Sequence, residues 1–202
     1  AGELIRSGEL VAFPTETVYG LGANAYLAES ARKVYAAKGR PSDNPLIVHV
    51  NDSADASLFA ETNETYKKLA KQFMPGPLTV ILPKKDVIPD EVTGGLRTVA
   101  VRCPSNPIAR ELIRRSGVPI AAPSANLSGK PSPTCAEHVM QDMDGRIAMV
   151  IDGGECEIGL ESTVIAVSGN SANVLRPGAV TPDMLRSAGI AVTVDEAVTD
   201  PA

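Results

Sequence analysis

An α/β fold, with a twisted mixed parallel/antiparallel sheet and flanking helices, is the fold class that this sequence predicts. Short apolar runs rich in Val, Ile and Ala alternate along the chain with segments whose apolar residues have helical spacing. Some connections between the predicted strands are too short for a crossover helix, so the sheet must include antiparallel pairs. The 202 residues include 3% aromatics and no Trp, which predicts one core made of aliphatic side chains.

The helices of the first half are indicated by apolar spacing and by the residues at their ends. Asn63 is placed to cap a helix with Tyr66, Leu69 and Phe73 on one face, and Pro75-Gly76-Pro77 ends it. In order, the predicted elements are a helix over 1–7 that stops at Gly8, a strand over 10–13, a loop over 15–22 whose two glycines permit tight turns, a helix over 29–38, a strand over 46–50, a helix over 64–74, a strand over 78–82, a polar loop over 83–95 and a strand over 99–101.

The second half continues the alternation and ends in a short tail. Asn106-Pro107 and Thr181-Pro182 each combine a helix cap with a proline in the first turn. In order, the predicted elements are a helix over 107–117, a strand over 120–122, a polar loop over 123–129, a helix from Ser132-Pro133 to Gly145 with Ala136, Val139, Met140 and Met143 inward, strands over 149–151, 163–167 and 173–175, and a helix over 182–189. Residues 1–190 are therefore expected to form one domain and residues 191–202 a tail or the start of a linker.

Composition and charge exclude several classes of protein. Cys103, Cys135 and Cys156 are widely spaced and accompanied by only two histidines, which argues against a disulfide framework or zinc site and favours a reducing cytoplasm. No apolar run approaches the ~18 residues of a membrane span. The net charge is −5; residues 1–150 hold 17 Lys and Arg against 16 Asp and Glu, whereas residues 151–202 hold 2 against 8. Because proteins that coat nucleic acid are usually basic, any recognition of anions should be local.

The stretch from Lys38 to Val50 concentrates chemistry-bearing side chains. Lys38 and Arg40 are two residues apart, and Pro41 favours an extended backbone at Arg40, so the two cations are predicted to form an anion clamp exposed to a crevice. His49 follows near the end of a buried strand. The alternative is a helix end with solvated Lys and Arg, followed by a turn and a core strand.

Polar side chains recur where predicted strands end, which is where α/β folds bind ligands. Cations and hydroxyl or amide groups that converge there suit a polyanion such as a nucleoside triphosphate. Each residue alone is more typical of a turn or a solvated rim, and it is their recurrence at strand ends that favours a site. The chain has no phosphate-binding Walker loop, no Gly-x-Ser-x-Gly elbow and no tight acidic cluster, so a divalent ion is expected to arrive with phosphates, as Mg²⁺ does. The residues concerned are Thr15, Thr17, Lys38, Arg40, Arg102, Ser124, Asn126, Ser162, Thr163 and Arg176.

Seven short motifs follow one another along the chain. They are Pro-Thr-Glu-Thr-Val-Tyr-Gly-Leu-Gly (14–22), Lys-Gly-Arg-Pro with Asn-Pro-Leu-Ile-Val-His (38–49), Pro-Gly-Pro-Leu-Thr (75–79), Arg-Cys-Pro (102–104), Ala-Pro-Ser-Ala-Asn-Leu-Ser-Gly (122–129), Glu-Ser-Thr-Val (161–164) and Leu-Arg-Pro-Gly (175–178). Together they make the chain resemble the YrdC-like family of L-threonylcarbamoyladenylate synthases from about residue 1 to about residue 190. The Lys-x-Arg and Ser-x-Asn pairs resemble the active synthases rather than divergent relatives that lack one or both.

The resemblance implies a YrdC-like fold with a concave basic face, and a reaction in which L-threonine, bicarbonate and ATP give threonylcarbamoyl-AMP and pyrophosphate. It implies Mg²⁺ carried with ATP, a monomer, and use of the product by separate proteins that modify an adenosine of tRNA; direct contact with RNA or tRNA stays open. Lys38 and Arg40 would act catalytically by neutralising charge. The residues implied to bind the substrate threonine are Thr17, His49, Arg102, Ala122 and Ser162. Those implied to bind ATP are Lys38, Arg40, Asn44, Thr98, Ser124, Asn126, Ser132 and Arg176.

Two other functions remain open at the level of sequence. A non-catalytic RNA-binding module would use the concave face, and a related enzyme could adenylate another carbamoyl donor, as the similar domain of hydrogenase maturation proteins does. The acidic net charge argues against the first. Arg102 with His49 and Thr17 is typical of an amino-acid site and favours threonine. Larger family members also carry a second domain beyond a linker, and residues 191–202 correspond to where such a linker is expected to begin.

Overall fold

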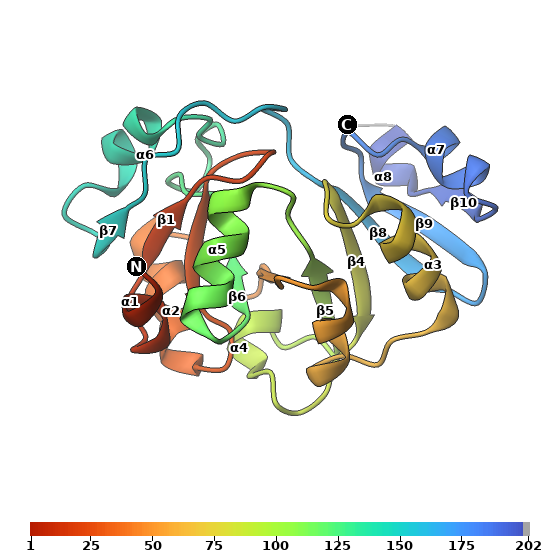
Figure 1. The fold of residues 1–202 in the computed structure, drawn as a ribbon, viewed down its shortest axis with the longest axis horizontal. Coiled ribbons are helices and arrows are strands. Elements are labelled where there is room, and N and C mark those ends of the chain that lie inside the picture. The colour runs from red at the N-terminus through yellow and green to blue at the C-terminus, as the bar shows by residue number, and fades with distance from the viewer. Residues whose placement is uncertain (200–202) are drawn as a thin grey trace.

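The computed structural model describes residues 1–199 and contains a single ten-stranded sheet with helices packed against it (Figure 1). The strand order is β10-β9-β8-β4-β5-β3-β6-β2-β1-β7, with parallel and antiparallel neighbours in the same sheet. The predicted mixed α/β class is therefore confirmed. None of the described helices has the length and apolar character that crossing a membrane requires.

The helices and strands follow the predicted order closely. The strands are β1 (Val11–Phe13), β2 (Gly20–Asn24), β3 (Ile47–His49), β4 (Leu78–Pro83), β5 (Thr98–Arg102), β6 (Ile120–Ala122), β7 (Met149–Val150), β8 (Thr163–Ser168), β9 (Ser171–Arg176) and β10 (Ala191–Val194). The helices are α1 (Gly2–Arg6), α2 (Ala28–Lys38), the 3₁₀ helix η1 (Ser53–Leu58), α3 (Glu64–Phe73), α4 (Asp90–Thr93), α5 (Pro107–Ser116), α6 (Ala136–Met143), α7 (Pro182–Ser187) and α8 (Glu196–Thr199).

One face of the central sheet is closed by the main core. The register brings Val48 of β3 beside Val101 of β5, and Val80 of β4 beside both Val101 and Ile165 of β8. All four side chains are fully buried, and helices α2, α3 and α6 supply apolar residues to the same cluster. Since side chains alternate along a strand, the neighbours of these residues must face the other way.

The opposite face is only partly covered. A second cluster packs α1 and α5 over β1 and β6, through Ile5, Leu112, Phe13 and Ile120. Figure 1 shows α5 lying over this end of the sheet. Beyond it, on β3, β5 and β4, the half-buried Ile47, Ala100 and Ile81 line a pocket instead of contacting a helix. The fold thus leaves the middle of one sheet face available for a ligand.

The expected turns at Gly20 and Gly22 are wrong, because both residues lie in β2 beside β1 and neither has a positive φ. A Cβ at Gly20 would lie 3.1 Å from Cζ of Phe13, and one at Gly22 would lie 3.0 Å from Cε1 of the same ring. These glycines therefore make room for Phe13 on the face of the sheet instead of forming the predicted tight turns.

Two further expectations are corrected at the level of elements. Residues 191–194, expected in a tail, form β10 and pair in parallel with β9; residues 200–202 lie outside the described chain. Helix α6 begins at Ala136 rather than at Ser132-Pro133, because the Pro133 carbonyl accepts a hydrogen bond from the Tyr19 N–H and that segment is extended against the loop before β2. Met140, expected to point inward, is 44% exposed.

Candidate active site

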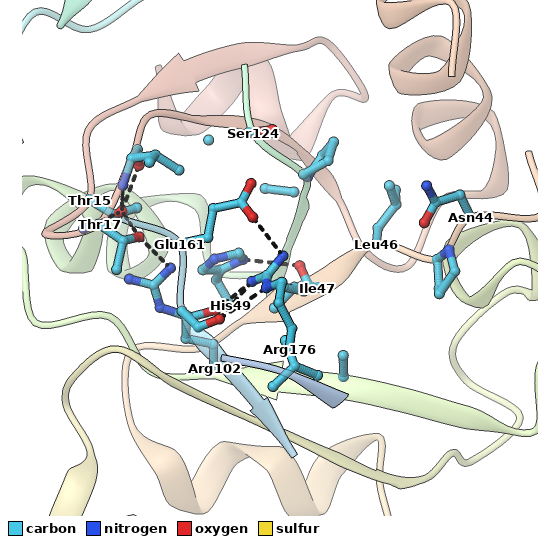
Figure 2. Close-up of a pocket in the computed structure, with 18 of the residues that line it drawn as sticks. Thr15, Thr17, Asn44, Leu46, Ile47, His49, Arg102, Ser124, Glu161 and Arg176 are labelled. Carbon is cyan, nitrogen blue, oxygen red and sulfur yellow. Dashed lines mark hydrogen bonds and ion pairs between the residues drawn. The ribbon is translucent and has the colours of Figure 1, made fainter. Parts of the chain in front are cut away.

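A pocket of about 250 Å³ occupies the open sheet face, and most of the site residues predicted from the sequence line it (Figure 2). The sheet supplies the floor, while the loops before β2, before β3 and after β6 supply the walls. The predicted residues that line it are Thr15, Thr17, Arg40, Asn44, His49, Arg102, Ala122, Ser124, Ser162 and Arg176. The structure therefore brings these residues together around one pocket, and their roles stay predictions.

Arg102 ends β5 and is 4% exposed, within a network that the sequence did not predict. Its Nη2 donates to Oε1 of Glu16 at 2.6 Å, and its Nη1 donates to Oγ1 of Thr17 at 2.9 Å. Thr17 is itself held by Thr15, because the Oγ1 atoms of the two residues lie 2.9 Å apart. One end of the pocket is thus a rigid arrangement of a guanidinium and hydroxyl groups.

Glu16 is the functional residue that sequence reasoning missed at this end. It is 3% exposed, and its second oxygen, Oε2, accepts from the backbone N–H groups of Ser105 and Asn106 at 3.2 and 3.4 Å. Asn106 is the cap of α5, so the carboxylate also lies at the positive end of that helix. A carboxylate between two threonines just after a strand was the available signal, because a buried Glu requires a partner.

His49, at the end of β3, is held in the neutral form with its proton on Nδ1. That nitrogen lies 3.0 Å from the Ile47 carbonyl and 3.2 Å from the Ile120 carbonyl, and carbonyls only accept hydrogen bonds. Burial, with the nearby positive charge of Arg102, lowers the pKa of His49 from 6.5 to about 3. Its Nε2 is therefore an acceptor and cannot carry positive charge at neutral pH.

We expect NMR of ¹⁵N-labelled protein to show His49 as the neutral, Nδ1-protonated tautomer from pH 8 down to pH 5. The reason is the lowered pKa: an unfolded chain would bind a proton near pH 6.5, while the folded chain resists protonation until about pH 3. The same difference means that this histidine withdraws stability as pH falls from 6.5 toward 3. A His138→Gln variant assigns the two imidazole signals, and an imidazolium spectrum for His49 at pH 6 would contradict the assignment.

A second set of polar contacts in the pocket involves Glu161, which belongs to a predicted motif but was assigned no role. Its Oε2 lies 3.2 Å from Nη1 of Arg176, and its Oε1 accepts from Oγ of Ser132 at 2.8 Å. Arg176 also donates from Nη2 to the Ser162 carbonyl at 2.9 Å and to its Oγ at 3.1 Å (Figure 2). Burial lowers the pKa of Arg176, although a guanidinium stays charged at neutral pH.

The structure contradicts the exposed clamp predicted for Lys38 and Arg40. Lys38 ends α2 at 2% exposure, and its Nζ donates to the backbone carbonyls of Ser124 and Asn126. Gly39, with φ 64°, turns the chain, so Lys38 and Arg40 do not share one side of an extended segment. Arg40 alone lines the pocket, and it donates to the carbonyls of Asn44 and Pro45 at 3.1 and 3.0 Å.

Three other residues that were predicted to bind ATP do not line the pocket. Asn126 is buried and donates from Nδ2 to the carbonyls of Leu127 and Lys130 at 2.9 and 2.8 Å, which fixes its loop. Ser132 contacts the pocket only through Glu161. Thr98 begins β5 and pairs with Pro83. The family resemblance named these polar residues but could not give the direction of their side chains.

The charges of the pocket are partly balanced. Arg102 and Arg176 are paired with Glu16 and Glu161, so the concave basic face stays a prediction. Among the described residues, no group of three or more His, Cys, Asp and Glu is arranged to hold a metal ion. Glu161 could offer one carboxylate oxygen to a divalent cation, and the remaining ligands would have to be ligand phosphates and water.

Comparisons with known proteins place this pocket in a family. The Sua5/YciO/YrdC family model, described as telomere recombination, matches residues 3–178. The chain is 54% identical over 202 residues to the threonylcarbamoyl-AMP synthase of Bacillus subtilis (strain 168), covering 99% of this chain and 58% of the relative. It is 56% identical over 179 residues to that of Pyrococcus abyssi (strain GE5 / Orsay), covering 88% and 53%.

The fold agrees with the same relatives. The crystal structure of P. abyssi Sua5 complexed with L-threonine is similar with a TM-score of 0.91 and 51% identity, over 95% of this chain and 57% of that one. The chain thus spans little more than half the length of these relatives. A family match over residues 3–178, together with relatives that are more than half identical, shows that this chain belongs to the Sua5/YciO/YrdC family.

Proposed function

We propose that the chain carries the site for making threonylcarbamoyl-AMP from L-threonine, bicarbonate and ATP, with release of pyrophosphate, as a nucleotidyltransferase. One observation carries the proposal: a single pocket is lined by Arg102, Thr17 and His49 and also by the two further cations Arg40 and Arg176. The relatives named threonylcarbamoyl-AMP synthase, and a relative crystallised with L-threonine, support the same substrates.

The Arg102 end suits an α-amino acid. The N–H groups of Arg102 that Glu16 and Thr17 leave free would bind the carboxylate of threonine. His49, neutral with an accepting Nε2, would take a hydrogen bond from the threonine hydroxyl or amine without repelling the amine. Ser162 would supply a hydroxyl and Ala122 an apolar contact at the floor of the same pocket.

The chemistry needs positioning rather than a protein nucleophile. The amine lone pair of threonine forms a C–N bond to the carbon of bicarbonate, and water leaves to give a carbamate. A carbamate oxygen then attacks the α-phosphorus of ATP, and the bond to pyrophosphate breaks. Arg40 and Arg176 would neutralise the growing charge on the phosphoryl oxygens and leaving group, beside the Ser124 and Asn44 side chains.

Mg²⁺ carried with ATP is proposed as the cofactor, held by phosphate oxygens with Glu161 as the available carboxylate. When bound, it would withdraw charge from the phosphates. We further propose that the protein works in the cytoplasm as a monomer, and that separate proteins transfer the threonylcarbamoyl group to tRNA.

The proposal is tested by incubating the protein with ATP, Mg²⁺, bicarbonate and single amino acids. Mass spectrometry should detect threonylcarbamoyl-AMP with threonine, in equal amount to the pyrophosphate released. Pyrophosphate with another carbamoyl donor but not with threonine would favour the related adenylating enzyme. RNA binding that weakens steeply with salt, without any ATP turnover, would favour the RNA-binding module.

The three cysteines should be dispensable for this chemistry. Within the described chain all three are free, and burial raises the pKa of Cys103 to about 11, so it is a poor nucleophile. A variant with Cys103, Cys135 and Cys156 replaced by Ser is expected to release pyrophosphate within about twofold of the parental rate, since surface or isosteric changes seldom alter a site. A variant that melts normally but is inactive would show that a thiol takes part.

A further inference from the structure

The geometry points to Glu16 as a positioning residue: it fixes the orientation of Arg102, and recognition of the substrate α-carboxylate depends on that orientation. This inference rests on the proposed function, because it assumes that Arg102 binds the carboxylate of threonine. Glu16 is not among the residues that line the pocket, so it would act through Arg102 rather than by touching the substrate.

The two oxygens of Glu16 have different partners, and this makes the residue a bridge. Oε1 accepts from Nη2 of Arg102 at 2.6 Å, while Oε2 accepts from the N–H groups of Ser105 and Asn106 at the start of α5. The Glu16 carbonyl also accepts from the Ile158 N–H at 2.9 Å, so its backbone is held as well. The carboxylate therefore connects the guanidinium to a fixed helix end.

Arg102 keeps donors that its protein partners do not use. A guanidinium has five N–H donors, and Glu16 and Thr17 accept from different terminal nitrogens. Among the described residues, Nε of Arg102 is buried without a hydrogen-bond partner. That nitrogen is enclosed by protein, so the donors that remain for a substrate carboxylate are the second N–H groups of the two terminal nitrogens. The network thus orients Arg102 and leaves it incomplete.

Charge and orientation predict opposite effects when Glu16 is changed. Removal of its negative charge would leave Arg102 less neutralised. If Glu16 acted only through its charge, the variant would therefore bind a carboxylate more tightly. Loss of orientation would make the variant bind threonine more weakly. Gln at this position cannot replace both oxygens, because one of its two terminal groups is a donor that would face either the guanidinium or the N–H groups of α5.

The test is a double-mutant cycle measured by calorimetric titration with threonine, using Glu16→Gln, Arg102→Gln and the double variant. We expect Glu16→Gln to raise the Kd for threonine by at least about tenfold, a size consistent with a misplaced binding group. The Kd for ATP should stay within about twofold, and Glu16→Gln should have no further effect once Arg102 is already Gln. Threonine binding that is unchanged or tighter in Glu16→Gln would overturn the inference. So would a Glu16→Gln change that weakens threonine binding as much in the Arg102→Gln protein as in the parental protein.

A second variant guards against failure to fold. Glu16→Asp keeps the charge and both acceptor oxygens but moves them back by one methylene, so it should weaken threonine binding while its melting curve stays cooperative. Parental threonine affinity in a folded Glu16→Asp protein would also overturn the inference. If the parental protein itself bound no threonine, the proposed function would fail instead, and that result is visible before any variant is compared.

Discussion

Arg102→Ala is expected to weaken threonine binding by ~2 to 5 kcal/mol while changing ATP binding much less, because the carboxylate would lose its charged partner in a desolvated pocket. The same change should destabilise the fold. Glu16, at 3% exposure, would keep a buried charge whose guanidinium partner has gone, and breaking a buried pair in this way typically costs about 3 to 5 kcal/mol.

The two effects are separated by titrating threonine and ATP independently, well below the melting temperature of the variant. Arg114→Ala is the matched control, because Arg114 pairs with Glu111 on the exposed surface of α5. Its replacement should change the affinity for neither threonine nor ATP. Arg102→Lys gives a milder folded variant that keeps the charge without the planar fork. An equal loss of threonine and ATP binding in Arg102→Ala would mean that Arg102 only supports the fold.

Caps and apolar spacing explain why so much of the fold followed from the sequence. Asn63, Asn106 and Thr181 each accept a backbone N–H at the start of the helix they were predicted to cap. These signals are local, so one sequence is enough to detect them. In β2 the glycines match turn chemistry, and only the contact with Phe13 on β1 shows that they belong in a strand. That information lies in the packing and not in the segment.

The site shows the same division between position and direction. The ends of β3, β5 and β9 were predicted, and the structure brings His49, Arg102 and Arg176 from these ends to one pocket. The carboxylates Glu16 and Glu161 escaped notice because their importance comes from partners that are far away in the sequence. Sequence spacing cannot show which arginine will find a carboxylate.

Lys38 is the residue whose side-chain direction was predicted wrongly, and its replacement is expected to have a large effect on both stability and activity. Lys38→Met keeps an apolar stem but removes the donor to the Ser124 and Asn126 carbonyls, so the loop that carries Ser124 should lose its anchor. Each buried carbonyl left unpaired costs about 1 to 3 kcal/mol, and release of pyrophosphate should fall by roughly 10²-fold if a few kcal/mol of positioning is lost.

Arg40→Ala is the matched comparison, because Arg40 is half-exposed and contacts only nearby carbonyls. It should alter stability by only ~0.5 kcal/mol while it weakens ATP binding. The double change of Lys38 and Arg40 to Ala should abolish pyrophosphate release, but loss of stability would come from Lys38 alone. A Lys38→Met protein with the parental melting temperature and turnover would show that the Lys38 ammonium is not needed to hold the loop that carries Ser124.

The pH dependence of stability distinguishes a buried ammonium from an exposed one. Burial, with a smaller effect of Arg40, lowers the pKa of Lys38 from 10.5 to about 8. Between these two values the unfolded chain holds a proton that the folded chain has released, so the free energy of unfolding rises with pH across that window. The parental protein should therefore gain stability relative to Lys38→Met as pH rises from about 8 to 10.5, as measured by urea denaturation at fixed ionic strength. A difference that stays constant with pH would mean that Lys38 is solvated, as the sequence alone suggested.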